Sequence, residues 1–90
     1  MNDITKFDFT GICVECETYE EELALMTEFD SRGFKFRSGN SPMDFMDCSF
    51  RDENVYQNTK LGIMSSTRVY QESKGNCENV YTFKELFGEV

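Results

Sequence analysis

The stretch from Thr18 to Gly33 constrains the fold more than any other, because both ends of a helix are marked within it. Thr18 and Glu21 have the spacing of a capping box, in which each side chain accepts a hydrogen bond from the other residue's backbone N–H. Gly33 can take the left-handed conformation that commonly follows the last turn of a helix. A helix is therefore predicted from Tyr19 to about Arg32.

This helix is predicted to be amphipathic, with a single apolar stripe. At about 100° per residue, the stripe comprises Tyr19, Leu23, Met26 and Phe29, with Leu25 at its edge. Glu20, Glu21 and Glu28 are expected to point away from it into solvent. Glu22 falls within the stripe, but in the first turn, where a carboxylate suits the helix dipole. The stripe must be buried against a second layer, and a sheet is the simplest one.

Shorter segments alternate apolar and polar side chains, which is the period of strands. The predicted strands are Phe9–Cys16, Phe34–Arg37, Lys60–Met64, Thr67–Glu72 and Cys77–Tyr81. A Ser65-Ser66 turn is expected between the third and the fourth, and the polar stretch Arg51–Asn58 is predicted to be a connection. Met43–Phe50 fits neither period. A second capping box, Thr82 with Glu85, predicts a short C-terminal helix that Gly88 ends.

These elements predict a single α+β domain over residues 1–90, a usual domain length. Its sheet would have four or five mostly antiparallel strands, with the amphipathic helix on one face and a short C-terminal helix. The other face would then be exposed or would bind a partner. A free face or edge of this kind favours a homodimer.

The net charge of −8 is unevenly distributed along the chain. Residues 1–30 contain nine acidic side chains and one basic one, whereas residues 31–90 contain eight of each. Such a field attracts basic surfaces and repels nucleic acid and anionic lipid, so we expect no direct binding to nucleic acid or membranes. The predicted partner-binding residues are Glu17, Glu20, Glu21, Glu28 and Asp30. The alternative is a solvated helix face that only keeps the protein soluble.

Four cysteines raise the question of a metal or redox site. Cys13 and Cys16 form a C-x-x-C motif, but Cys48 and Cys77 do not form the second pair that a zinc ribbon requires. In a strand, moreover, residues three apart face opposite sides. We therefore predict no metal and no cofactor, and interpret the cysteines as small buried residues in a reducing compartment. A metal- or redox-active C-x-x-C module remains an alternative, because Cys16 lies just before the helix cap.

Catalysis is not expected, because the chain contains no histidine. Histidine is the usual general base for a serine or cysteine nucleophile and the commonest metal ligand. The sequence also lacks a phosphate-binding loop of the P-loop or G-x-G-x-x-G type. We therefore predict a binding protein, with no catalytic residues.

A second candidate site lies after the helix, around Lys35, Arg37 and Ser38. Two cations, a hydroxyl and the backbone amides of a Ser-Gly-Asn-Ser loop are groups that hold phosphate. This pattern supports an alternative function, an oligomer that sequesters a small anionic nucleotide signal. An ordinary loop leaving a strand has the same composition.

Two segments resemble a class of small bacteriophage-encoded early or accessory proteins. Gly33-Phe34-Lys35-Phe36-Arg37-Ser38-Gly39 is similar to the G-[FY]-K-[WF]-x-S-G segment that follows a helix in that class. Val80 to Phe87 is similar to its closing strand and capped helix. The resemblance covers the first 40 residues and the last ten, with Phe36 where tryptophan is commoner. It implies a protein that binds and inhibits host or anti-phage defence machinery, and it carries no catalytic residues over.

The first functional hypothesis is therefore a phage-encoded inhibitor that blocks a nuclease, restriction, CRISPR or transcription component. Its acidic surface would occupy the basic site where the partner binds nucleic-acid phosphates. A cytoplasmic location in the host is expected, because the N-terminal residues MNDITKFDF contain no apolar run of a targeting or membrane segment.

Overall fold

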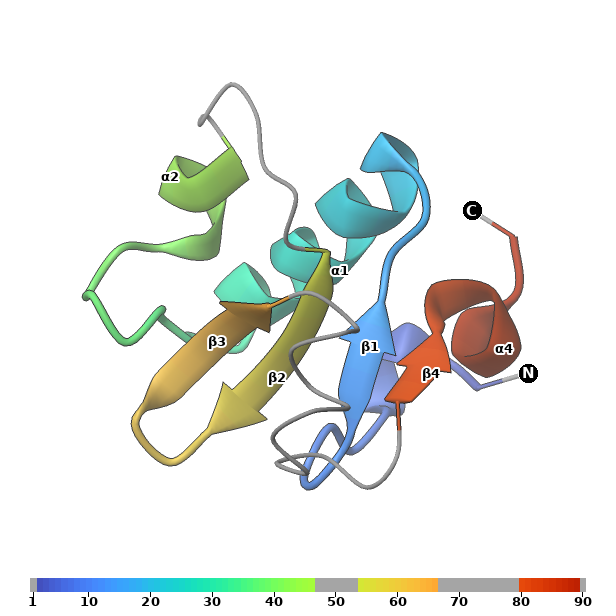
Figure 1. Cartoon of the computed structure of the whole chain (residues 1–90), viewed down its shortest axis with the longest axis horizontal. Coiled ribbons are helices and arrows are strands. Elements are labelled where there is room, and N and C mark those ends of the chain that lie inside the picture. Colours follow the sequence, from blue (N-terminus) through green and yellow to red (C-terminus); the bar gives the residue numbers. More distant parts are fainter. Residues whose placement is uncertain (1, 47–53, 67–79, 90) are drawn as a thin grey trace.

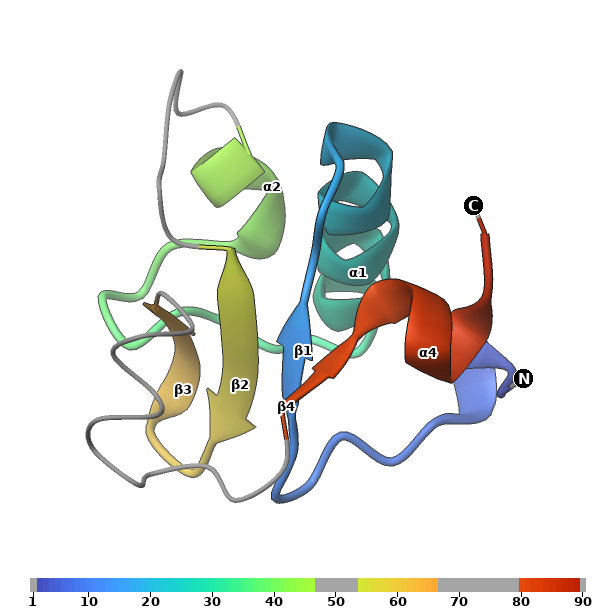
Figure 2. The same ribbon diagram turned by 45° about the vertical axis from the view of Figure 1, so that its right-hand side comes forward.

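The computed structural model describes residues 2–46, 54–66 and 80–89 of the chain. The elements in chain order are η1 (Ile4–Lys6), β1 (Cys13–Glu15), α1 (Tyr19–Ser31), α2 (Pro42–Met46), β2 (Val55–Thr59), β3 (Gly62–Ser66), β4 (Val80–Thr82) and α4 (Phe83–Phe87). The four strands form one sheet in the order β3-β2-β1-β4. Helix α1 lies along one face of this sheet, and α4 lies beside the N-terminal segment (Figures 1 and 2).

The predicted α+β class is confirmed, and the sheet is mixed. Strands β1 and β2 pair antiparallel, as do β2 and β3. Strand β4 pairs parallel with β1, with Val14 opposite Tyr81. A parallel pair needs a long crossover, which here includes α1 and the β2–β3 hairpin.

Both ends of α1 lie where the sequence predicts, but only one bond of the predicted capping box forms, because the Glu21 carboxylate accepts from the Glu17 amide rather than from that of Thr18. The Thr18 hydroxyl accepts a hydrogen bond from the Glu21 amide over 3.1 Å. At the other end Gly33 has a φ of +78°. The Gly33 amide donates to Asp30 O and the Phe34 amide to Phe29 O, each over 3.0 Å, which is the Schellman pattern. The rings of Phe29 and Phe34 supply the accompanying apolar contact, with centroids 5.6 Å apart.

The predicted apolar stripe of α1 is wrong in its orientation. Tyr19 and Leu23 are 58% and 38% exposed, whereas Leu25, Met26 and Phe29 are buried. Glu21, expected in solvent, is only 2% exposed. The helix is rotated because two carboxylates find polar partners on the inner side. Glu21 accepts a hydrogen bond from the Glu17 amide over 2.8 Å, and Glu22 accepts one from the Tyr56 hydroxyl over 3.1 Å.

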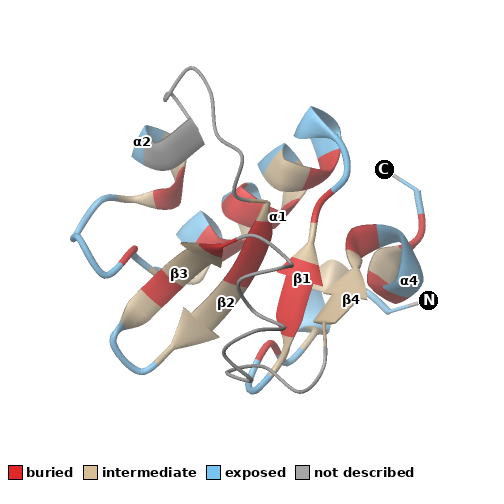
Figure 3. Ribbon diagram, viewed as in Figure 1, coloured by how far each residue is buried: buried red, intermediate tan, exposed pale blue. Residues whose placement is uncertain are grey.

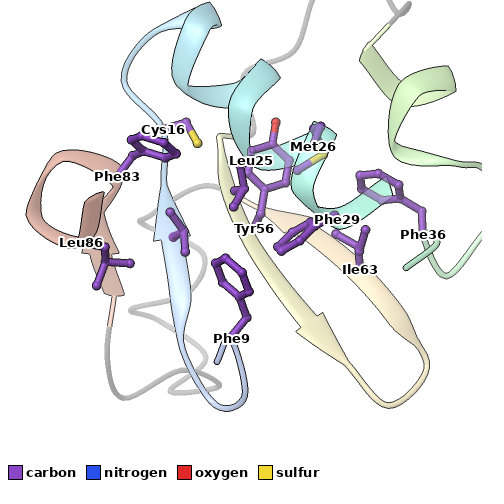
Figure 4. Close-up of a cluster of buried hydrophobic side chains, with 11 residues drawn as sticks. Phe9, Cys16, Leu25, Met26, Phe29, Phe36, Tyr56, Ile63, Phe83 and Leu86 are labelled. Atoms are coloured by element: carbon purple, nitrogen blue, oxygen red, sulfur yellow. The ribbon is translucent and has the colours of Figure 1, made fainter. Parts of the chain in front are cut away.

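A core rich in aromatic rings lies between α1, the sheet and α4 (Figure 4). Ring contacts link side chains from the N-terminal segment, α1 and α4 in a continuous series: Phe34, Phe29, Phe9, Phe7, Phe87 and Phe83. Phe7 and Phe87, for example, meet edge to face at 5.1 Å. Such pairs each contribute about 0.5–1.5 kcal/mol beyond their buried area. The series therefore ties both ends of the described chain to the helix.

The hairpin differs from its prediction in register and extent. Val55–Thr59, within the predicted connection, is strand β2, and the turn lies at Lys60-Leu61 rather than at Ser65-Ser66. Val55 and Tyr56 are both fully buried although they point to opposite sides of the sheet, so their segment does not alternate. The predicted strand Thr67–Glu72 lies outside the described residues.

Other predicted elements are shorter than expected. Only Cys13–Glu15 of Phe9–Cys16 is strand, and Phe34–Arg37 contributes a single bridge, Phe36 to Ile63. The ambiguous Met43–Phe50 lies partly in α2, and residues 47–50 are outside the described chain. Strand β4 begins at Val80, and residues 77–79 are likewise not described. The capping box of Thr82 and Glu85 is confirmed by reciprocal bonds of 3.1 and 3.0 Å.

The sheet face opposite α1 was expected to be open, and the structure corrects this where residues are described. Cys13 and Val55 share that face and are 0% exposed, and Ser66, paired with Val55, is buried too (Figure 3). Because these residues are buried, this part of the sheet offers no open surface on which a second copy could pack. The homodimer stays a prediction.

Candidate functional site

The exposed side of α1 is the candidate interaction surface. At about 100° per residue, its exposed residues all fall within one arc of the helix, and Figure 3 shows α1 with both buried and exposed positions. We define the α1 outer face by Tyr19, Glu20, Leu23, Thr27 and Asp30. A helix of 13 residues is about 20 Å long, so this face is a strip with an acid near each end, Leu23 between the two acids and Tyr19 in the first turn.

Three of the five predicted partner-binding acids are accessible. Glu17, Glu20 and Asp30 are exposed, with Glu17 just before the N-cap. Glu28 is half-buried and forms an ion pair with Arg32, at 2.7 Å between Oε2 and Nε. Glu21 is buried and serves the helix cap, so its expected place on the surface is wrong. The sequence reasoning missed that Tyr19 and Leu23 join the acids on this face.

The chemistry of the α1 outer face suits a macromolecular partner. Tyr19 supplies a ring with a hydroxyl, and Leu23, one turn further on, supplies an aliphatic group beside it. Aromatic side chains dominate binding energy at protein interfaces, and charged residues around them set the orientation. The Thr27 hydroxyl donates to Leu23 O over 2.7 Å, so its proton is already engaged.

The alternative anion site is an exposed loop packed against β3. Lys35, Arg37 and Ser38 are all exposed, which leaves their side chains accessible. The backbone, however, is engaged in pairing: the Arg37 amide donates to Ile63 O over 3.3 Å, and Lys35 O accepts from the Ile63 amide over 2.8 Å. Within the loop itself, the Gly39 amide, one of the donors expected to hold a phosphate, is already used, since it donates to Phe36 O over 2.8 Å.

The C-x-x-C motif does not form a closed redox pair. Cys13 is disulfide-bonded, while Cys16 is a buried free thiol. The expectation that Cys13 is a reduced, unbonded residue is therefore wrong, although its burial is as expected. Burial raises the pKa of the Cys16 thiol well above its usual value, and the carboxylates of Glu22, Glu21 and Glu15 raise it further. Reactive thiols need the opposite environment, one that stabilises the thiolate.

A hollow that the sequence did not suggest lies between the N-terminal segment, α1 and α4. Its volume is about 310 Å³. Its lining residues are Asn2, Asp3, Ile4, Ala24, Phe83, Phe87 and Glu89, and we call it the α1–α4 hollow. The i, i+4 spacing of Phe83 and Phe87 indicates that the two rings share one face of α4. The sequence does not indicate that the N-terminal residues pack beside them.

No protein-family model, curated protein or solved structure matches this chain. Within the described segments, no helix is both long and apolar enough to cross a membrane. The same segments contain no group of three or more acidic or cysteine side chains placed to hold a metal ion.

The segment that resembles the phage proteins has a clear structural role. Gly33 and Gly39 both have positive φ values, +78° and +96°, so glycine suits both ends of the motif. Between them Phe34 packs on Phe29 and Phe36 pairs with Ile63. These residues join α1 to the hairpin, so the segment has a role in connecting two parts of the fold.

Proposed function

We propose that this chain is a phage-encoded inhibitor that binds and blocks a basic, nucleic-acid-binding protein of the host or of anti-phage defence. The observation that carries the proposal is the α1 outer face, where the side chains of Tyr19 and Leu23 are exposed on the same side of the helix as Glu20 and Asp30. The phage origin and the class of partner rest on the resemblance of Gly33–Gly39 and Val80–Phe87 to phage accessory proteins.

The charge distribution supports a basic partner. All of the excess negative charge belongs to residues 1–30, and on α1 and just before its cap this charge is exposed at Glu17, Glu20 and Asp30. A partner that holds nucleic-acid phosphates with lysine and arginine would meet carboxylates in their place. The acidic field would also speed association at low salt, because opposite charges steer two proteins together.

Tyr19 and Leu23 would contribute a share of the binding free energy that salt does not screen, because burial of apolar surface does not depend on charge. Tyr19 and Leu23 are exposed one turn apart, so a partner seated on the α1 outer face would bury both side chains. Ionic screening weakens the contacts of Glu20 and Asp30, since the screening length is about 8 Å at physiological ionic strength. The complex is therefore expected to weaken with salt but not to dissociate completely.

The proposal is tested by capture of binding proteins from a bacterial lysate on the immobilised chain, at low and high salt. The test variant carries Glu20→Lys and Asp30→Lys. The matched control carries Asp8→Lys and Asp44→Lys, which change the net charge equally at exposed positions off the α1 outer face. Far-UV circular dichroism checks that both variants fold.

We expect one captured protein to bind the parent chain and the control variant but to be lost with the test variant. Its binding to DNA or RNA should then be inhibited by the parent chain in proportion to occupancy. Equal loss with both variants would mean that only net charge matters, and undiminished capture by the test variant would remove α1 from the interface; either result refutes the proposal.

A further inference from the structure

The α1–α4 hollow combines an apolar interior with a polar mouth. Ile4 and Ala24 are half-buried and Phe83 is buried, with Phe87 beside it. The polar lining residues, Asn2, Asp3 and Glu89, are exposed. The rings of Phe83 and Phe87 lie 4.9 Å apart at 61°, so they form an angled aromatic wall. Figures 1 and 2 show α4 and the N-terminal segment together beside α1.

The mouth of the hollow is negatively charged and held in place. Asp3 accepts hydrogen bonds from the Thr5 hydroxyl over 2.7 Å and from the Thr5 amide over 3.0 Å. These bonds lower the pKa of the Asp3 carboxyl, which is therefore ionised at neutral pH. The N-terminal segment is anchored to α4, because the Asn2 amide and side chain both donate to Leu86 O, over 2.8 and 3.0 Å. Among the described residues that line the hollow, Asp3 and Glu89 are the charged ones.

A second hollow of about 260 Å³ adjoins the first, since Glu89 lines both. It is lined by Thr18, Glu20, Glu21, Lys84 and Glu89, so three acids face one base. Glu20 belongs to the α1 outer face, and Ala24, one turn further along α1, lines the α1–α4 hollow. The acidic surface thus continues from the outer face of α1 to the mouth of the α1–α4 hollow.

We propose that the α1–α4 hollow receives one arginine or lysine side chain of the protein partner, with its aliphatic stem against Phe83 and Phe87 and its cation between Asp3 and Glu89. This deepens the proposed function and rests on it for the identity of the partner. The hollow is at the small end of ligand sites, which run from about 300 to 1,000 Å³, so it suits a single side chain. Long cationic side chains bury their stems on apolar surface while the charge stays near water, and aromatic rings attract the cation.

The test uses the isolated chain and a defined probe, so it does not depend on finding the partner. Acetyl-arginine amide is titrated into labelled protein, and the NMR signals of the Ala24 methyl group and of the Phe83 and Phe87 rings are followed. Acetyl-citrulline amide is the control, because it has nearly the same shape without the charge. We expect saturable shifts at these signals with the arginine probe and at least about tenfold weaker binding of the citrulline probe, a ratio of the size expected when one charge pair is lost.

Two variants test whether the arginine probe binds in the α1–α4 hollow. Ala24→Leu fills the hollow without changing charge, and Glu89→Gln removes one charge at an exposed position where folding is not at risk. Both variants should weaken binding of the arginine probe by about fivefold or more, whereas Asp44→Asn, on α2, should leave the affinity for the probe unchanged. Equal binding of the two probes, or binding unaffected by Glu89→Gln, would overturn the inference.

The same variants separate this inference from the proposed function. Capture that is lost with Glu20→Lys and Asp30→Lys but retained with Ala24→Leu would support the α1 outer face and overturn the hollow as part of the interface. Probe binding in the hollow without any inhibited partner would support a cation site and refute the inhibitor. Loss of both capture and probe binding with Ala24→Leu, in a variant that folds normally, supports both.

Discussion

Gly62 allows the hairpin and the loop after α1 to approach each other closely. A Cβ atom at this position would lie 2.7 Å from Lys35 O and 2.9 Å from Arg37 N, and the φ of Gly62 is +127°. Alanine in such a conformation costs about 1–3 kcal/mol. Moving the loop away also weakens the two bonds between Ile63 and the loop, each contributing about 0.5–1.5 kcal/mol. We therefore expect Gly62→Ala to lower the free energy of unfolding by about 2–6 kcal/mol, a large share of the 5–15 kcal/mol typical of a domain.

Gly39→Ala is the matched control. Its φ is also positive, +96°, but a Cβ atom there would meet nothing within 4 Å. Urea unfolding followed by far-UV circular dichroism, under the same redox conditions, gives the free-energy difference between the variants. We expect Gly62→Ala to be less stable than Gly39→Ala by about 2 kcal/mol, or roughly 8–16 °C in Tm for a domain of this size. Equal destabilisation would show that backbone conformation alone matters and would refute the argument from close approach.

Two further predictions concern Arg32 and Cys16. Arg32 pairs with Glu28, donates to Ile4 O over 3.0 Å and lies 4.9 Å from the Phe9 ring centre, so Arg32→Met should lower the free energy of unfolding by about 1–2 kcal/mol. Arg37→Met, at an exposed control position, should change it by less than about 0.5 kcal/mol. Similar effects of the two variants in urea unfolding would contradict the role of Arg32. The pKa of the Cys16 thiol is raised in the folded state. Above about pH 8.5 the thiol therefore loses its proton in the unfolded chain but keeps it in the folded one. The free energy of unfolding should then fall as the pH rises above that value. Cys16→Ala should remove up to about 1.4 kcal/mol per pH unit of that fall, and alkylation of native Cys16 should be slow; identical pH profiles would refute burial as the cause.

The parts of the fold that the sequence predicts are those with local signals. Thr18, Gly33 and the Thr82–Glu85 pair mark helix ends because capping acts over three or four residues. The accessible acids Glu17, Glu20 and Asp30 were likewise found from charge and helix position alone.

The features that were missed depend on contacts that the periodicity of a single segment does not reveal. The rotation of α1 follows from Tyr56 donating to Glu22 and from the capping role of Glu21, and neither partner is identifiable from helical periodicity. Strand β2 was missed because Val55 and Tyr56 are buried on opposite faces, which removes alternation. The same limits explain why Tyr19 and Leu23 were assigned to the core and why the α1–α4 hollow was not foreseen.

The bonds from Asn2 to Leu86 O join groups 84 positions apart in the chain. Contacts of such long range are expected to form late, because closing so long a loop costs more chain entropy than forming the local contacts of α1 or of the hairpin. We expect the N-terminal segment and α4 to close on the rest of the molecule last and to open first, as a local event that leaves the hairpin and α1 in place. The hollow between them would then exist only while the ends are closed, so a bound cation should slow amide exchange at Asn2 and α4 more than anywhere else.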